Sequence, residues 1–155
     1  MPLRKFGFAL LLLPFVPFAS HASAQESPAA SATVIPDADQ MQPADLAQIL
    51  KSDAAKPLIL QVGPKVFYQE ARIKGAKYAG PGSNAQGLQL LDKAISGLGK
   101  DAFVVIYCGC CPWNRCPNVG PAFAHLHGLG YTNVKVLYLA NNFGDDWVRK
   151  GYPRE

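Results

Sequence analysis

Charge is scarce in this sequence of 155 residues, and it is not gathered in one place. Lys and Arg number 15, Asp and Glu number 11, and only 17% of all residues are charged. The basic residues are scattered, so the chain lacks the dense positive patch with which proteins bind nucleic acid or an anionic membrane surface. We therefore expect no nucleic-acid partner.

The chain also lacks an apolar run long enough to form an ordinary membrane-spanning helix. The longest apolar run, residues 6–18, is under 18 residues and contains two prolines. Arg4 and Lys5 precede it, and the small residues Ala22–Ala24 follow it, which is the pattern of a secretory signal peptide. We predict that residues 1–24 are such a signal and that the protein is periplasmic or secreted, without stable membrane insertion after cleavage. An uncleaved membrane anchor is the alternative.

Bulky apolar residues are nearly missing from residues 25–39, which are rich in Ala, Ser and Pro. Such a segment cannot bury enough surface to offset the entropy lost on ordering, so we predict a flexible leader. The remainder, residues 40–155, is too short for two ordinary domains and shows no internal repeat. We expect one folded domain there.

Strand and helix patterns alternate along that domain. The strongest strand, residues 103–107, is apolar throughout and β-branched at its centre, which predicts that both of its faces are covered. Alternation of strands with helices predicts an α/β fold, with a parallel central sheet and helices on both faces. The expected strands are 58–62, 76–79, 103–107 and 134–139, and the expected helices are 43–50, 84–98, 118–129 and 145–150, with a helical turn at 66–72.

All four cysteines lie in one nine-residue segment, Cys108–Cys116, directly after the strongest strand. In open α/β sheets, ligands bind at the carboxyl ends of the strands. A cysteine between a strand and the start of a helix lies where backbone N–H groups converge, and these groups favour the thiolate. We therefore predict Cys108 as a nucleophile, with Arg115 available to bind the charge of an anionic substrate.

Three other interpretations of the cysteine segment stay open. Disulfides could brace the loop in an oxidising compartment; links from Cys110 or Cys111 to Cys116 would leave Cys108 free, whereas a Cys110–Cys111 bond would be strained. The Cys-x-x-Cys spacing suits a thiol-disulfide or sulfur-relay protein, with Cys110, Cys111 and Cys116 as redox or resolving candidates. Four thiolates could bind zinc, or fewer could bind reduced copper, although a regular cage from one short loop is awkward.

The two histidines of the helix predicted over 118–129 do not add a metal site. His125 and His127 lie two residues apart, so they point to different faces of the helix and cannot chelate one ion together. We predict that no metal and no other cofactor is required.

The order of these pieces resembles the rhodanese-like family. The resemblance rests on Cys108 after a buried strand, a loop that contains Arg115, a helix that ends in residues 129–131, and a finish of Trp147 followed by residues 151–153. Earlier in the domain, residues 58–62 resemble the family's first core strand, and residues 72–76 resemble its Gly-His-Ile-Pro-Gly-Ala segment. The chain is thus similar to a single rhodanese-like domain.

The resemblance implies a cysteine-dependent sulfurtransferase. In that family the cysteine that Cys108 matches takes a sulfane sulfur from a donor such as thiosulfate, holds it as a persulfide, and passes it to a thiol or to cyanide. The partners would be a small sulfur-containing substrate and a thiol acceptor; the sequence identifies no protein partner. Arg115, Trp113 and the backbone of Gly109 are the candidate substrate contacts, and Trp113 is alternatively a hydrophobic plug.

The sequence departs from the family pattern at four places. Gln61 and Gly63 replace the Asp and Arg of the first strand, Arg72 replaces a histidine, and Asn141–Asn142 replace a glycine pair. Six residues separate Cys108 from the following arginine, whereas a typical sulfurtransferase has four. The predicted active-site loop is therefore enlarged and rebuilt.

Overall fold

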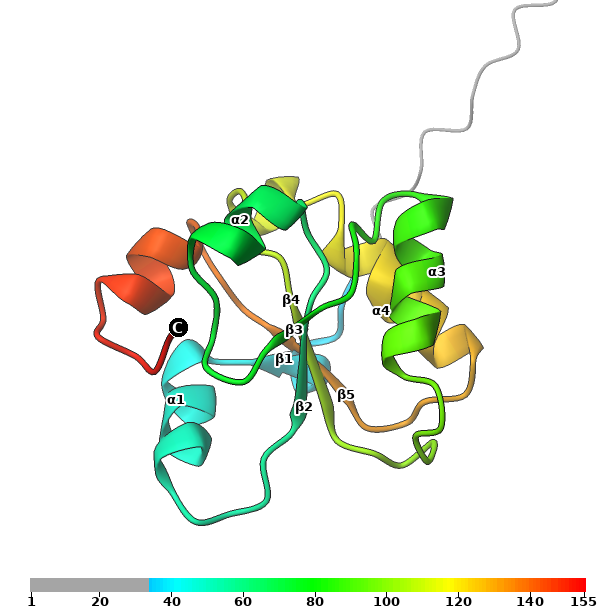
Figure 1. Cartoon of the computed structure of the whole chain (residues 1–155), viewed down its shortest axis with the longest axis horizontal. Coiled ribbons are helices and arrows are strands. Elements are labelled where there is room, and N and C mark those ends of the chain that lie inside the picture. The colour runs from blue at the N-terminus through cyan, green and yellow to red at the C-terminus, as the bar shows by residue number, and fades with distance from the viewer. Residues whose placement is uncertain (1–33) are drawn as a thin grey trace, which may run out of the picture. The chain divides into compact units, whose positions relative to one another are not determined.

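Five parallel strands form one sheet in the part of the chain that the structure, a computed structural model, describes, which is residues 34–155 (Figure 1). The order of strands across the sheet is β1-β5-β4-β2-β3, so β4 lies at its centre. The predicted signal peptide and the first part of the predicted leader lie outside the described residues. Within residues 34–155, none of the helices has the length and apolar character needed to cross a membrane.

The elements follow the alternation that the sequence predicts, so the predicted α/β class is confirmed. The strands are β1 (Gln40–Met41), β2 (Leu58–Gln61), β3 (Lys77–Tyr78), β4 (Val104–Tyr107) and β5 (Val134–Leu137). The helices are α1 (Pro43–Lys51), α2 (Lys65–Glu70), α3 (Ala85–Ala94) and α4 (Val119–Gly128), with two 3₁₀ turns, η1 (Asp37–Asp39) and η2 (Trp113–Arg115), and a π-helix, η3 (Gly144–Val148).

Two apolar cores lie on the two faces of the sheet. Alternate residues of β4 point to opposite faces, so Val104 and Ile106 enter one core while Val105 and Tyr107 enter the other. Helices α3 and α4 cover the first core, and α1 and η3 cover the second. The prediction of helices on both faces is therefore confirmed, and the carboxyl end of β4 emerges between the two layers.

The folded domain begins before residue 40, where the sequence places its start. Ile35, within the predicted leader, is only 7% exposed and packs in the first core. The short strand β1 then pairs with β5, and Lys135 Nζ binds Asp39 Oδ1 at 3.1 Å. The sequence gives almost no local sign of this start, which consists of one apolar side chain and a two-residue strand. Both are stabilised by residues of β5, about one hundred positions later in the chain.

Candidate active site

The cysteine loop begins at Cys108, directly after β4, as the sequence predicts. Cys108 is only 3% exposed. The next residue, Gly109, has a φ angle of 76°, and a Cβ atom there would lie 2.6 Å from Phe143 Cβ. Only glycine fits this turn, which the Phe143 N–H fixes by donating to the Gly109 carbonyl at 3.1 Å.

Two departures from the family pattern lie against Cys108. A Cβ atom at Gly63 would lie 2.6 Å from Cys108 Sγ, so the glycine makes room for the thiol. Gln61 is buried, and its Nε2 donates to the Cys108 carbonyl at 3.3 Å. The altered end of β2 is thus fitted to the altered cysteine loop.

The sulfur atoms of the loop converge. Cys110 Sγ lies 3.1 Å from Cys108 Sγ and 3.0 Å from Cys111 Sγ. The sulfurs of Cys108, Cys110 and Cys116 all lie within 4.8 Å of one another, and all four cysteines are free thiols. Three sulfurs at this spacing have the chemistry to hold a soft metal ion and are close enough to exchange a proton.

Asn118, which the sequence did not indicate as a site residue, contacts the sulfurs of Cys108 and Cys110. Its side chain is 3% exposed, and its Nδ2 donates to Cys108 Sγ at 3.3 Å and lies 4.0 Å from Cys110 Sγ. The Ser83 N–H donates to Asn118 Oδ1 at 3.3 Å, which fixes the amide. Asn118 therefore presents a donor where negative charge on sulfur can be stabilised; its place before the first turn of α4 was the one signal available in the sequence.

The thiolate is favoured at a different cysteine from the one predicted. Hydrogen bonding from Cys108 lowers the pKa of Cys116 to about 6, helped by the N–H groups of Asn118 and Val119. The hydrogen bond to Cys116 and burial raise the pKa of Cys108, and burial raises the pKa of Cys111 to about 12. The N–H groups at the start of α4 thus help to lower the pKa of Cys116 and not that of Cys108.

These pKa shifts predict that Cys116 and Cys111 are alkylated with very different dependence on pH. Because its pKa is lowered, Cys116 is a thiolate above about pH 6 and a thiol below it, so iodoacetamide should modify it half-maximally near pH 6. Cys111, whose pKa is raised, should react only in strongly alkaline solution and serves as an internal control. Pulsed alkylation with peptide mass mapping measures both, and equal profiles near the ordinary pKa of about 9 would contradict the assignment.

A pocket of about 510 Å³ opens at the carboxyl ends of β2 and β4. Cys108, Gly109 and Cys110 form part of its wall, and Glu70 and Arg154 are its charged residues. The remaining lining is mostly apolar or amide-bearing: Gln61, Phe67, Ala71, Tyr107, Asn142, Phe143, Gly144 and Val148. Two thiols thus face a space large enough for a small organic or inorganic sulfur compound.

Two of the predicted substrate contacts lie elsewhere. Arg115 is exposed on η2, and neither it nor Trp113 is part of the pocket wall. The Trp113 ring packs against Tyr138, with 4.9 Å between ring centroids, and against the first core. Trp113 is therefore placed as the hydrophobic plug of the two alternatives, while Gly109 does line the pocket.

The C-terminal tail supplies the cation of the pocket. The backbone N–H of Arg72 donates to the Glu155 carbonyl at 2.9 Å, and the backbone N–H of Glu155 donates to the Arg72 carbonyl at 3.0 Å. The side chains also pair, with 3.0 Å between Arg72 Nε and Glu155 Oε1. These contacts fix Arg154 beside the pocket. The tail carries no periodic pattern, so nothing in the sequence indicated this residue.

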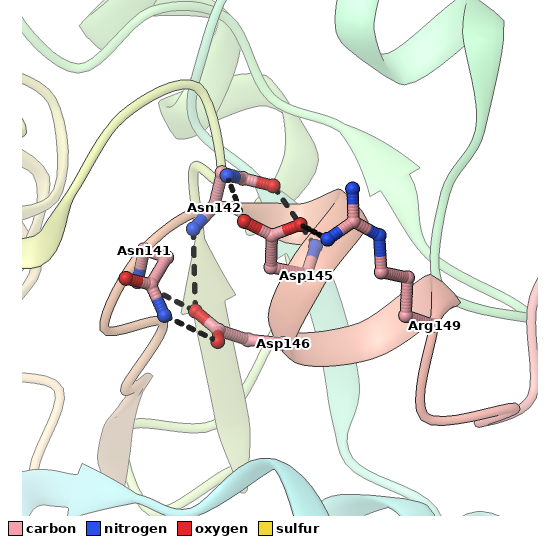
Figure 2. A network of polar contacts seen from close by, with 5 residues as sticks. All are labelled: Asn141, Asn142, Asp145, Asp146 and Arg149. Carbon is pink, nitrogen blue, oxygen red and sulfur yellow. Dashed lines mark hydrogen bonds and ion pairs between the residues drawn. The ribbon is translucent and has the colours of Figure 1, made fainter.

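The asparagine pair that replaces the family's glycines anchors another part of the pocket wall. Figure 2 shows Asp146 accepting from the Asn141 and Asn142 backbone N–H groups, at 2.7 and 3.2 Å, and from Asn141 Nδ2 at 3.1 Å. Asn142 Nδ2 donates to Asp145, which also pairs with Arg149 at 2.8 Å. The network fixes the pocket wall at Asn142 relative to η3.

The two histidines of α4 have separate partners. His125 Nε2 lies 2.6 Å from Asp92 Oδ1, and the His127 ring packs against Phe123 with 4.3 Å between centroids. They do not form a shared site.

The parallel sheet, its strand order and the cysteine loop after β4 define a rhodanese-like fold. The chain is similar to the solved rhodanese-like domain of the Alr3790 protein from Anabaena sp., at 23% identity over 76% of this chain and 78% of that one, with a TM-score of 0.56. It is also similar to the BH2092 protein of Bacillus halodurans, at 22% identity over 75% of each chain, with a TM-score of 0.58. No protein-family model and no curated protein matches the sequence.

Proposed function

We propose that the protein is a sulfurtransferase in which Cys108 carries a sulfane sulfur as a persulfide. The observation that carries this proposal is the position of Cys108, at the carboxyl end of the central strand and in the wall of the 510 Å³ pocket. Cys116, although more acidic, does not line that pocket, so of these two cysteines only Cys108 can meet a donor there. The rhodanese-like fold supports the same assignment.

The thiols of Cys108 and Cys116 and the Asn118 amide account for the proton and electron-pair transfers of the first step. Cys108 and Cys116 together hold one proton and one negative charge, and the proton must lie on Cys116 when Cys108 Sγ attacks the outer sulfur of thiosulfate; the donor's S–S bond breaks, and sulfite leaves with the electron pair. The Asn118 amide, 3.3 Å from Cys108 Sγ, offers a donor to the persulfide that forms. A thiol acceptor then takes the outer sulfur. The predicted signal peptide would place this reaction in the periplasm or outside the cell.

A steady-state assay with matched arginine variants tests the proposal. The protein should release sulfite from thiosulfate in the presence of a thiol acceptor. Arg154→Gln removes the cation of the pocket and should raise KM for thiosulfate roughly fivefold, the upper limit for a solvent-exposed ion pair. Arg115→Gln, whose side chain lies outside the pocket wall, should leave KM unchanged. Absence of sulfite release from the unmodified protein would refute the proposal.

A further inference from the structure

Cys110 is the second sulfur of the same pocket. Its Sγ lies 3.1 Å from Cys108 Sγ, and both residues line the pocket wall. The Gly109 turn, with its φ angle of 76°, bends the loop between the two cysteines. The Asn118 amide reaches toward both sulfurs, at 3.3 and 4.0 Å. A persulfide on Cys108 would therefore form beside the Cys110 thiol.

We propose that Cys110 resolves the Cys108 persulfide, so that the protein releases the transferred sulfur as sulfide and is left with a Cys108–Cys110 disulfide. This inference rests on the proposed function, because it needs the persulfide. It goes beyond that function because it gives the persulfide a second fate: when no acceptor takes the outer sulfur, that sulfur is reduced and released as sulfide.

The resolving step balances without an added oxidant. Cys110 Sγ attacks Cys108 Sγ, the bond between Cys108 Sγ and the outer sulfur breaks, and the outer sulfur leaves with the electron pair. The Cys110 thiol proton leaves with it as hydrosulfide. The sulfane sulfur is reduced to sulfide, while the two thiols are oxidised to a disulfide. A further turnover needs an external thiol reductant, two molecules of which restore the dithiol.

The other two cysteines are less well placed for this step. Cys111 Sγ lies against Cys110 Sγ and 3.6 Å from the Arg115 carbonyl, and Cys111 is not part of the 510 Å³ pocket wall. Cys111 and Cys116 share with Cys108 only a cavity of about 10 Å³ beside Trp113, which is too small for a sulfur donor. Of the three candidate resolving cysteines, Cys110 alone shares the 510 Å³ pocket with Cys108.

A single-turnover experiment tests the inference. The protein is reduced, freed of reductant, and given a small excess of thiosulfate with no acceptor; sulfite, sulfide and intact mass are then measured. The unmodified protein should release about one sulfide per molecule and end about 2 Da lighter. Cys110→Ser should release sulfite but no sulfide, and should retain an adduct of about 32 Da. Cys111→Ser should behave as the unmodified protein does.

The outcomes separate this inference from the proposed function. An adduct that persists on the unmodified protein without sulfide release would overturn the resolving role of Cys110, as would loss of sulfide release in Cys111→Ser but not in Cys110→Ser. If neither sulfite nor any adduct appears in Cys110→Ser, or in a second variant, Cys110→Ala, the proposed function itself fails.

Discussion

Replacing Cys108 by serine is expected to lower the rate of sulfite release from thiosulfate by a factor on the order of 10³ or more, because the variant lacks the sulfur that we propose attacks the donor. The structure places Cys108 in the pocket wall, with the Cys116 thiolate and the Asn118 amide next to it. A serine hydroxyl is a far weaker nucleophile toward sulfur, and it cannot hold a persulfide. The measurement is the initial rate of sulfite formation at saturating thiosulfate.

Two controls make this result specific. Cys108→Ala tests whether a buried hydroxyl, and not the missing sulfur, causes the loss, and circular dichroism checks that both variants are folded. Cys111→Ser should keep the rate within about twofold, since Cys111 lies outside the pocket wall. Retained activity in Cys108→Ser, with loss in Cys116→Ser, would assign the nucleophile to Cys116.

Replacing Trp147 by alanine is expected to lower the free energy of unfolding by about 3–5 kcal/mol, the usual cost of deleting a buried aromatic side chain. Trp147 is fully buried, packs against Phe143 and Tyr152, and donates from Nε1 to the Pro153 carbonyl at 3.0 Å. Because it ties η3 to the tail that carries Arg154, the variant should also raise KM for thiosulfate.

Urea denaturation measures the predicted loss of stability. Leu129→Ala is the matched control, because Leu129 is 42% exposed and its truncation should cost less than about 1 kcal/mol. A Trp147→Ala variant as stable as Leu129→Ala would show that the second core does not depend on the tryptophan.

The central elements were predictable because their sequences carry strong local signals. Strand β4 is a continuous apolar run, and α4 follows the cysteine segment with buried positions at helical spacing. Cys108 directly follows the last residue of β4 in the sequence. Because all strands of a parallel sheet end at the same edge, this alone places Cys108 at the edge where ligands bind. The fold class and the location of the cysteine loop are therefore consequences of local pattern and chain order.

The detailed site could not be predicted, because it depends on contacts between distant segments. Arg154 reaches the pocket only because the tail pairs with the segment around Arg72. Whether Cys108 or Cys116 becomes the thiolate depends on the hydrogen bond between the two thiols and on the N–H groups at the start of α4, and the spacing of the cysteines does not reveal either. The enlarged loop likewise moves Arg115 to the surface, although its place in the sequence resembles that of a substrate-binding arginine.

The most direct test of sulfur transfer through Cys108 is the intact mass of the Cys110→Ser protein before and after thiosulfate, followed by mapping of the modified peptide. This variant removes the proposed resolving thiol, so the persulfide should accumulate. We predict an adduct of about 32 Da on Cys108, absent when Cys108 is also replaced by serine. An adduct that maps to Cys116, or a mass that does not change, would contradict the account.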